Sequence, residues 1–292
     1  GFMRKGCRLV FADIEPTTLV MDVEDVRRKI TARTRVVVPV HLYGLPVQMS
    51  ALTASAQEHG LLVVEDCAQA PGAKVDGRSV GTFGDFGCFS FHSQKNITTL
   101  GEGGMIVTDR TDYAEKILGL RKIGQRPFVR QQKYWLPAMS NVIEAIPGVI
   151  PHNYALGEIQ AFAQLERRLA MRNRIFDELA HHPELSFQAI PTNCRSALHL
   201  LPARFDGHRF GTDRDQLIGL LYEKYKIKCV VQYYPLYRYE LFRRNGYTHA
   251  DCPNTDAFFD NMISFPFGSD FTDAQIEYLI ASIDAAVTEL KG

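Results

Sequence analysis

The sequence predicts an α/β protein with a large domain built on a mostly parallel sheet, followed by a smaller α+β unit. In the first half, short β-rich runs alternate with helical stretches, which is the pattern of successive βαβ units. Runs such as 35–43 (RVVVPVHLY) are almost continuously apolar, as expected for strands that are covered on both faces. We place the large domain at residues 1–150 and the smaller unit at residues 151–292.

The elements of the first half follow one another in regular order. Its strands are β-rich or apolar, and they are expected at 7–14, 35–43, 61–70, 83–93 and 103–109. Its helices show helical periodicity, and they are expected at 23–31, 48–60 and 111–120, the second of them ending at Gly60. Ligands of parallel sheets bind beyond the carboxyl ends of the strands. Asp13, His41, Asp66 and the segment after Ser90 are therefore site candidates.

The second half begins with an irregular stretch and a long helix. Residues 124–151 contain four prolines and the only tryptophan, and are expected to form an excursion between the two units. Residues 155–182 are amphipathic at helical spacing and predict a packing helix. After it we expect three strands and two helices, the strands at 185–190, 197–206 and 227–234 and the helices at 213–225 and 273–290.

Composition excludes several classes of protein. Lys plus Arg and Asp plus Glu each number 33, so the net charge is zero and favours neither a nucleic acid nor an acidic membrane as partner. No window approaches the roughly 20 apolar residues of a membrane span. The six cysteines show neither CxxC spacing nor a cluster with histidine, so we expect no metal. These features, and the lack of a signal peptide at the start of the sequence, predict a cytoplasmic protein.

The segment 63–108 contains the residues with the clearest chemistry. A carboxylate, Asp66, ends a buried run, and a glycine-rich stretch follows it. The motif FSFHSQK then supplies a hydroxyl (Ser90), an imidazole (His92) and an amine (Lys95) within six residues. Pyridoxal 5'-phosphate (PLP) chemistry requires a lysine for a Schiff base, a carboxylate for the pyridine nitrogen, and hydroxyl and N–H groups for the phosphate.

Three motifs resemble a known family. The segments 36–44 (VVVPVHLYG), 65–73 (EDCAQAPGA) and 80–109 (VGTFGDFGCFSFHSQKNITTLGEGGMIVTD) closely resemble the DegT/DnrJ/EryC1/StrS family of PLP-dependent sugar aminotransferases. The resemblance covers nearly the whole chain, and its motifs agree in order and in spacing. It implies a fold-type I aminotransferase, with a PLP-binding large domain and a smaller C-terminal domain.

The resemblance assigns roles to five residues. Lys95 resembles the Schiff-base lysine, and Asp66 resembles the partner of the pyridine nitrogen. Gln69 is similar to the family glutamine beside the cofactor ring hydroxyl and the sugar, and Ser90 is similar to the phosphate-binding serine. Asn153 resembles an asparagine that reaches the phosphate in the neighbouring subunit, which implies a homodimer with shared active sites. An alternative for Asn153 is a helix N-cap, because it lies just before the helical run ALGEIQ. Many family members also have arginine where this chain has Ala155, which is a local departure from the resemblance.

Two further residues are candidate substrate contacts. His92 is either a packed residue at the end of a strand or part of the site. Tyr233 lies in the run VVQYYPLYRYELF, whose tyrosines are expected to contribute partly to the core and partly to a substrate wall.

The implied reaction moves an amino group from glutamate or glutamine to a keto-sugar that is nucleotide-linked. The alternatives are a keto-cyclitol aminotransferase, a PLP-dependent sugar dehydratase and a non-catalytic homologue. Relatives that act as dehydratases replace the lysine with histidine, so Lys95 argues against that reading. Family members also carry a segment ahead of the region that residues 1–13 match, which supplies phosphate and ring contacts. We expect this sequence to record only ordered residues, with that segment mobile when PLP is absent.

Overall fold

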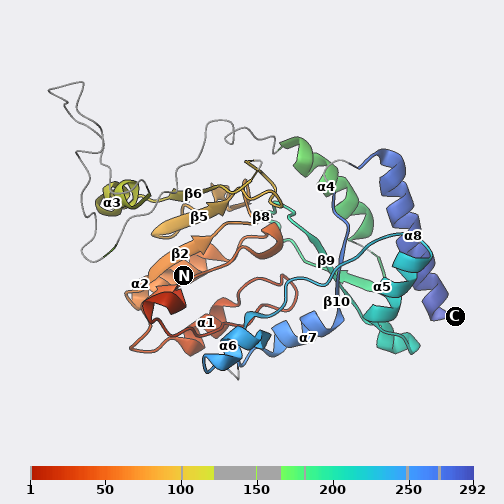
Figure 1. The fold of residues 1–292 in the computed structure, drawn as a ribbon, viewed down its shortest axis with the longest axis horizontal. Coiled ribbons are helices and arrows are strands. Elements are labelled where there is room, and N and C mark those ends of the chain that lie inside the picture. Colours follow the sequence, from red (N-terminus) through yellow and green to blue (C-terminus); the bar gives the residue numbers. More distant parts are fainter. Residues whose placement is uncertain are drawn as a thin grey trace.

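The computed structural model describes residues 2–99, 101–121, 149, 166–180, 182–247, 250–268 and 271–292. Three of the expected features lie wholly or partly outside these residues. The irregular stretch at 124–151, the first part of the helix at 155–182 and the position of Asn153 lie outside the described residues, apart from residue 149. Figure 1 shows two groups of elements, one around β2, β5 and β6 and the other around β9 and β10 with α4, α5 and α8.

The first sheet has the strand order β1-β2-β5-β6. Its strands are β1 (Val36–Val37), β2 (Leu62–Asp66), β5 (Phe86–Ser90) and β6 (Gly104–Val107). The pairs β1–β2 and β2–β5 are parallel, whereas β6 runs antiparallel to β5. The sheet is therefore mostly parallel, as the sequence predicts, with an antiparallel strand next to β5.

Three helices accompany this sheet. They are α1 (Val23–Lys29), α2 (Met49–Glu58) and α3 (Thr111–Arg121). Valines and leucines of α1, α2 and β2 share one buried cluster, which includes Val26, Leu52 and Val63. Tyr113 of α3 packs edge-on against Phe86 of β5, with 5.5 Å between ring centroids. These helices therefore occur where the apolar periodicity of the sequence predicts them.

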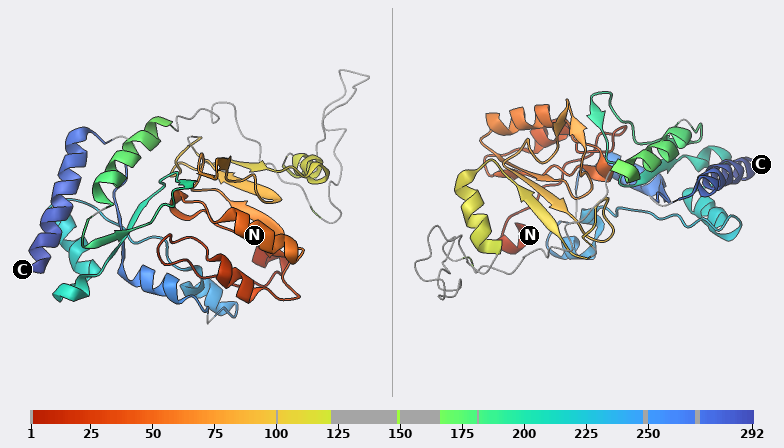
Figure 2. Two further views of the ribbon diagram at one scale, coloured as in Figure 1. Left: turned by 180° about the vertical axis from the view of Figure 1, so that it is seen from behind. Right: turned by 90° about the horizontal axis from the view of Figure 1, so that it is seen from above.

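The second sheet is antiparallel, with the order β10-β9-β7. Its strands are β7 (Leu185–Phe187), β9 (Leu201–Phe205) and β10 (Met262–Phe265). The accompanying helices are α4 (Glu166–Leu179), α5 (Arg214–Glu223) and α8 (Asp273–Lys291). Figure 2 shows these helices beside the sheet. The core that the elements share includes Ile175, Phe205, Leu217 and Ile283. Both α5 and α8 begin with a capping box, Asp213 with Gln216 and Thr272 with Gln275.

A third, small sheet joins the two halves of the sequence. It has the order β4-β3-β8, with β3 (Lys74–Val75), β4 (Arg78–Ser79) and β8 (Cys194–Arg195). Because β3 and β8 are more than 100 residues apart, their pairing is a tertiary contact that local periodicity does not reveal.

Several expectations about secondary structure are wrong. Residues 7–13 form no strand, and only Ile14 makes an isolated bridge, to Met21. The run 227–234 contributes a single bridge, Val230 to Ser264, and the run 35–43 contains only the short strand β1 and an isolated bridge from Val40 to Asp66. The sequence also gave no sign of β10, α6 (Glu240–Arg244) and α7 (Pro253–Asn261). Apolar runs identify burial, but hydrogen bonds to a neighbouring chain segment decide whether a run becomes a strand.

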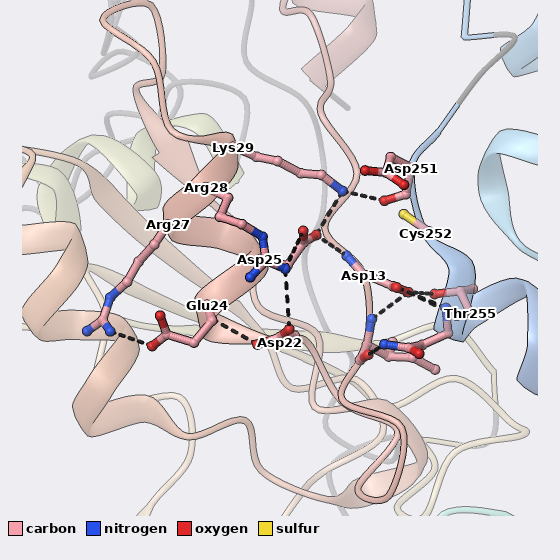
Figure 3. Close-up of polar contacts among 12 residues, drawn as sticks. Asp13, Asp22, Glu24, Asp25, Arg27, Arg28, Lys29, Asp251, Cys252 and Thr255 are labelled. Carbon is pink, nitrogen blue, oxygen red and sulfur yellow. Dashed lines mark hydrogen bonds and ion pairs between the residues drawn. The ribbon is translucent and has the colours of Figure 1, made fainter.

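The N-terminal segment is attached to α7 by buried carboxylates (Figure 3). The carboxylate of Asp13 accepts hydrogen bonds from the backbone N–H groups of Asn254 and Thr255 at 2.9 Å, in the first turn of α7. The backbone N–H of Asp13 donates to Asp25, which also pairs with Lys29 of α1. A negative charge at a helix N-terminus is stabilising, so Asp13 caps a helix that begins at Pro253, far along the chain.

Among the described helices, none is long and apolar enough to cross a membrane. The six cysteines all carry free thiols.

Candidate active site

Asp66 lies where the parallel strands of the first sheet end. It is the last residue of β2, and its backbone pairs with Pro39 and His41 on one side and with Cys88 of β5 on the other. Its carboxylate oxygen Oδ1 accepts a hydrogen bond from the N–H of Ala68 at 3.0 Å, which holds the half-buried side chain in one orientation. Within the described part of the chain, Oδ2 has no hydrogen-bond partner and remains available to a ligand.

Ser90 and Lys95 lie at the end of the neighbouring strand and in the loop after it. Ser90 is the last residue of β5, so its hydroxyl lies at the same edge of the sheet as Asp66. The next loop is closed by Thr99, whose N–H donates to the carbonyl of Phe91 at 2.9 Å. Lys95 lies within this loop and is half-buried, and its Nζ makes no hydrogen bond or ion pair with any described residue. A half-buried amine in that state is available for covalent chemistry.

Glu65 holds the glycine-rich turn that lies against this edge of the sheet. Its fully buried carboxylate accepts hydrogen bonds at 2.7 Å from the N–H groups of Gly81, Phe83 and Gly84, and lies 3.1 Å from Nε2 of His41. Burial opposes ionisation of Glu65, but these hydrogen bonds outweigh it and place its pKa below the usual value. Glu65 is therefore a charged group that joins β2 to the turn before β5.

His41, Glu65 and Cys67 also lie close enough together to be considered as metal ligands. Nδ1 of His41 accepts a hydrogen bond from the N–H of Val47, so the proton of a neutral ring is on Nε2 and points to Glu65. Burial raises the pKa of the Cys67 thiol, which disfavours the thiolate that a metal requires. The side chains of His41 and Glu65 already form hydrogen bonds within the protein, and we assign the three residues a structural role.

Gln69 is buried one turn beyond Asp66 and contacts the loop after β1. Its Oε1 accepts a hydrogen bond from the N–H of Tyr43 at 2.7 Å, which leaves the NH₂ group as the end that can donate to a ligand. The Tyr43 ring stacks on Tyr233 with 6.2 Å between centroids, and its hydroxyl donates to the carbonyl of Gln232 at 3.1 Å. Tyr43 thus links Gln69 to the tyrosine-rich segment of the second half.

The backbone of residues 43–44 lies directly against residues 197–199. The N–H of Ala197 donates to the carbonyl of Gly44, and the N–H of His199 donates to the carbonyl of Tyr43, both at 2.8 Å. Gly44 has a φ of +94°, and a Cβ at this position would lie only 2.8 Å from the backbone nitrogen of Leu198. Only glycine permits both the conformation and this approach.

We predict that Gly44→Ala destabilises the protein by about 2–4 kcal/mol, because it combines left-handed strain with a backbone clash. The matched control is Gly77→Ala, where φ is +77° but no heavy atom lies within 4 Å of the added Cβ. Its cost is limited to the backbone strain, about 1 kcal/mol. Urea unfolding of the three proteins measures both values, and equal losses for the two variants would contradict the close packing at Gly44.

His92 and Tyr233, the two candidate substrate contacts, differ in their surroundings. Nδ1 of His92 accepts from the N–H of Gln94 at 3.3 Å, and its Nε2 lies 3.5 Å from the exposed carboxylate of Glu102. These contacts fit a residue that closes the loop around Lys95. Tyr233 is 41% exposed, and its hydroxyl lies 3.3 Å from Nε2 of His199.

A polar group beside Lys95 was not expected from the sequence. His199 is buried, and its Nδ1 lies 2.7 Å from Oδ1 of Asn96, the residue after Lys95. Arg172 of α4 donates to the same oxygen at 2.8 Å. The available signal was a histidine within the apolar run ALHLLPARF, where a buried imidazole needs a polar partner.

Comparisons with known proteins identify the family of this chain. The model of the DegT/DnrJ/EryC1/StrS aminotransferase family matches residues 2–284. UDP-N-acetyl-3-dehydro-alpha-D-glucosamine 3-aminotransferase of Acidithiobacillus ferrooxidans is 31% identical over 282 residues, which cover 93% of this chain and 69% of that protein. GDP-perosamine synthase of Caulobacter vibrioides is 32% identical over 293 residues, which cover 96% and 73%.

The fold is also similar to solved structures. The aminotransferase from Psychrobacter cryohalolentis superposes with a TM-score of 0.84 at 24% identity, covering 97% of this chain and 76% of that one. The fold is thus that of a fold-type I aminotransferase. From the family match over nearly all its length, the chain belongs to the DegT/DnrJ/EryC1/StrS family of PLP-dependent sugar aminotransferases.

Proposed function

We propose that this protein transfers an amino group from glutamate or glutamine to the ketone of a nucleotide-linked sugar. The observation that carries the proposal is the environment of Lys95. Its amine has no hydrogen-bond or ion-pair partner among the described residues, and it follows the strand β5, whose neighbour β2 ends at Asp66. In a chain of this family, that combination supports Lys95 as the residue that binds the cofactor covalently.

The donor set fits PLP. The cofactor supplies an aldehyde and an electron-withdrawing pyridine ring. The free Oδ2 of Asp66 is an acceptor for a protonated ring nitrogen, because Oδ1 is already held by Ala68. The hydroxyl of Ser90, at the end of the adjacent strand, is a donor for the phosphate. Because Oε1 of Gln69 contacts Tyr43, its NH₂ group is the end that can donate to a ring hydroxyl or a sugar oxygen.

Lys95 has two tasks in this proposal. Its amine would bind the cofactor covalently, and the same amine would move protons at the carbon of the amino donor. Asp66 would hold the ring nitrogen of the cofactor through its carboxylate. His92 and Tyr233 are proposed to contact substrate at the rim of the site.

The choice of a nucleotide-linked keto-sugar is supported by the two curated relatives, whose names specify UDP- and GDP-linked sugars. A keto-cyclitol acceptor is the alternative that differs least in chemistry. Lys95 itself argues against a dehydratase. The amine of Lys95, which has no hydrogen-bond or ion-pair partner among the described residues, argues against a non-catalytic homologue.

The experiment measures the two half-reactions separately. Purified protein loaded with PLP is mixed with glutamate or glutamine. A decrease in the absorbance of lysine-bound PLP then reports amino transfer. The aminated protein is then given UDP-, GDP- and dTDP-linked keto-sugars and keto-cyclitols, and mass spectrometry identifies the aminated product. Protein that binds PLP at Lys95 but accepts amino groups from neither donor would refute the proposal.

We further propose a homodimer with shared active sites, in which Asn153 of one subunit contacts the cofactor phosphate bound in the other. The test mixes two inactive variants, Lys95→Ala and Asn153→Ala. Recovery of activity on subunit exchange is expected if each site uses residues of both chains, and its absence would show that each site is built from one chain.

A further inference from the structure

The polar group beside Lys95 has a defined direction of hydrogen bonding. Nδ2 of Asn96 donates to the carbonyl of Ala197 at 2.7 Å, which identifies the other amide atom, Oδ1, as the oxygen. Arg172 donates to this oxygen at 2.8 Å. Oδ1 has no proton to give, so the nitrogen of His199 that lies 2.7 Å from it must be the donor. His199 therefore carries its proton on Nδ1.

The imidazole of His199 is neutral. Only 5% of the residue is exposed. Burial, together with the positive charges of Lys95 and Arg172, lowers the pKa of His199 to about 3. A neutral ring with its proton on Nδ1 has an unprotonated Nε2, which can only accept a hydrogen bond.

This state of His199 decides the orientation of the Tyr233 hydroxyl. The two groups are 3.3 Å apart, and because Nε2 accepts, the hydroxyl of Tyr233 must donate. Burial raises the pKa of Tyr233, so the phenol retains that proton. With its proton directed at His199, the phenolic oxygen presents its lone pairs to any other partner.

We propose that His199 is a positioning residue that holds Tyr233 as a hydrogen-bond acceptor for a sugar hydroxyl at the Lys95 site. This rests on the proposed function, since it concerns the substrate handled there. Tyr233 is 41% exposed and is thus accessible to a ligand. Sugar hydroxyls donate hydrogen bonds readily, whereas the carboxylates of glutamate accept them and would be repelled by an acceptor oxygen. The effect should therefore concern the sugar and not the amino donor.

Two variants of His199 separate orientation from packing. In His199→Asn, the amide nitrogen can replace Nδ1 as the donor to Asn96, but the Nε2 acceptor is lost. In His199→Gln, the longer side chain can place an amide oxygen near the position of Nε2. We expect His199→Asn to lower kcat/KM for the keto-sugar half-reaction roughly tenfold, the value of about one hydrogen bond, and to leave the glutamate half-reaction within about twofold. His199→Gln should recover part of the loss.

The decisive measurement is a double-mutant cycle with Tyr233→Phe. If His199 acts through the Tyr233 hydroxyl, His199→Asn has no further effect in the Tyr233→Phe background. Equal losses in both backgrounds, or equal losses in both half-reactions, would overturn the proposal and indicate a purely structural role.

A second measurement does not involve the reaction. The ¹⁵N chemical shifts of His199 in the cofactor-free protein distinguish an Nδ1–H ring from an Nε2–H ring and from imidazolium. We expect the Nδ1–H form throughout the range from pH 5 to pH 8, and any other form would overturn the proposal. Failure of the proposed function would show instead as absence of PLP trapped on Lys95 by borohydride, which leaves the ¹⁵N result unaffected.

Discussion

Replacing Lys95 with alanine is expected to abolish amino transfer and the absorbance of lysine-bound PLP. The amine is proposed both to bind the cofactor and to move protons, and the loss of proton transfer alone costs on the order of 10²- to 10⁴-fold. Stability should change by less than about 0.5 kcal/mol, because Nζ has no hydrogen-bond or ion-pair partner among the described residues. Absorbance spectra, half-reaction rates and urea unfolding measure the three quantities.

The matched control is Lys224→Ala, which removes an exposed ion pair with Glu289 at the end of α5. It should retain the absorbance band and the reaction rates. A Lys95→Ala protein that still forms the same band would show that another lysine binds the cofactor, and would overturn the assignment of the site.

The largest effect on stability is expected from Glu65→Ala. The substitution leaves the N–H groups of Gly81, Phe83 and Gly84 and the Nε2–H of His41 without their acceptor, and the hydrogen bonds of Gly81 and His41 are buried. Removing one member of such a buried charged group costs about 3–5 kcal/mol. The turn also leads into β5, which ends at Ser90, so weaker PLP binding should accompany the loss of stability.

Urea unfolding and PLP titration measure both effects of Glu65→Ala. The control is Glu58→Ala, at the exposed end of α2, which should cost less than about 0.5 kcal/mol. A loss from Glu65→Ala as small as that of the control would contradict the role of Glu65 as the acceptor for this turn.

The same carboxylate makes stability depend on pH. The pKa of Glu65 in the folded protein lies below its usual value of 4.5. Its contribution is therefore fully present above about pH 4.5 and is lost as the pH falls through the folded pKa. We expect the free energy of unfolding of Glu65→Ala to vary less with pH below this value than that of the parent protein.

The sequence by itself determined the family, the parallel sheet and the positions of the cofactor candidates. Asp66 and Ser90 could be placed at strand ends because long apolar runs precede them, and the spacing from Ser90 to Lys95 is a local property of one motif. Helices α2, α5 and α8 were predicted for the same reason, since their apolar periodicity does not depend on the rest of the chain.

Only the tertiary structure revealed the contacts between distant segments. The pairing of β3 with β8, the cap that Asp13 provides for α7 and the network of Asn96, His199 and Tyr233 each join residues that are far apart in sequence. The physical reason is that a hydrogen bond depends on distance and direction in space, to within a few tenths of an ångström. Periodicity indicates which residues are buried, whereas the partner of a buried polar group is decided by the packing of the whole chain.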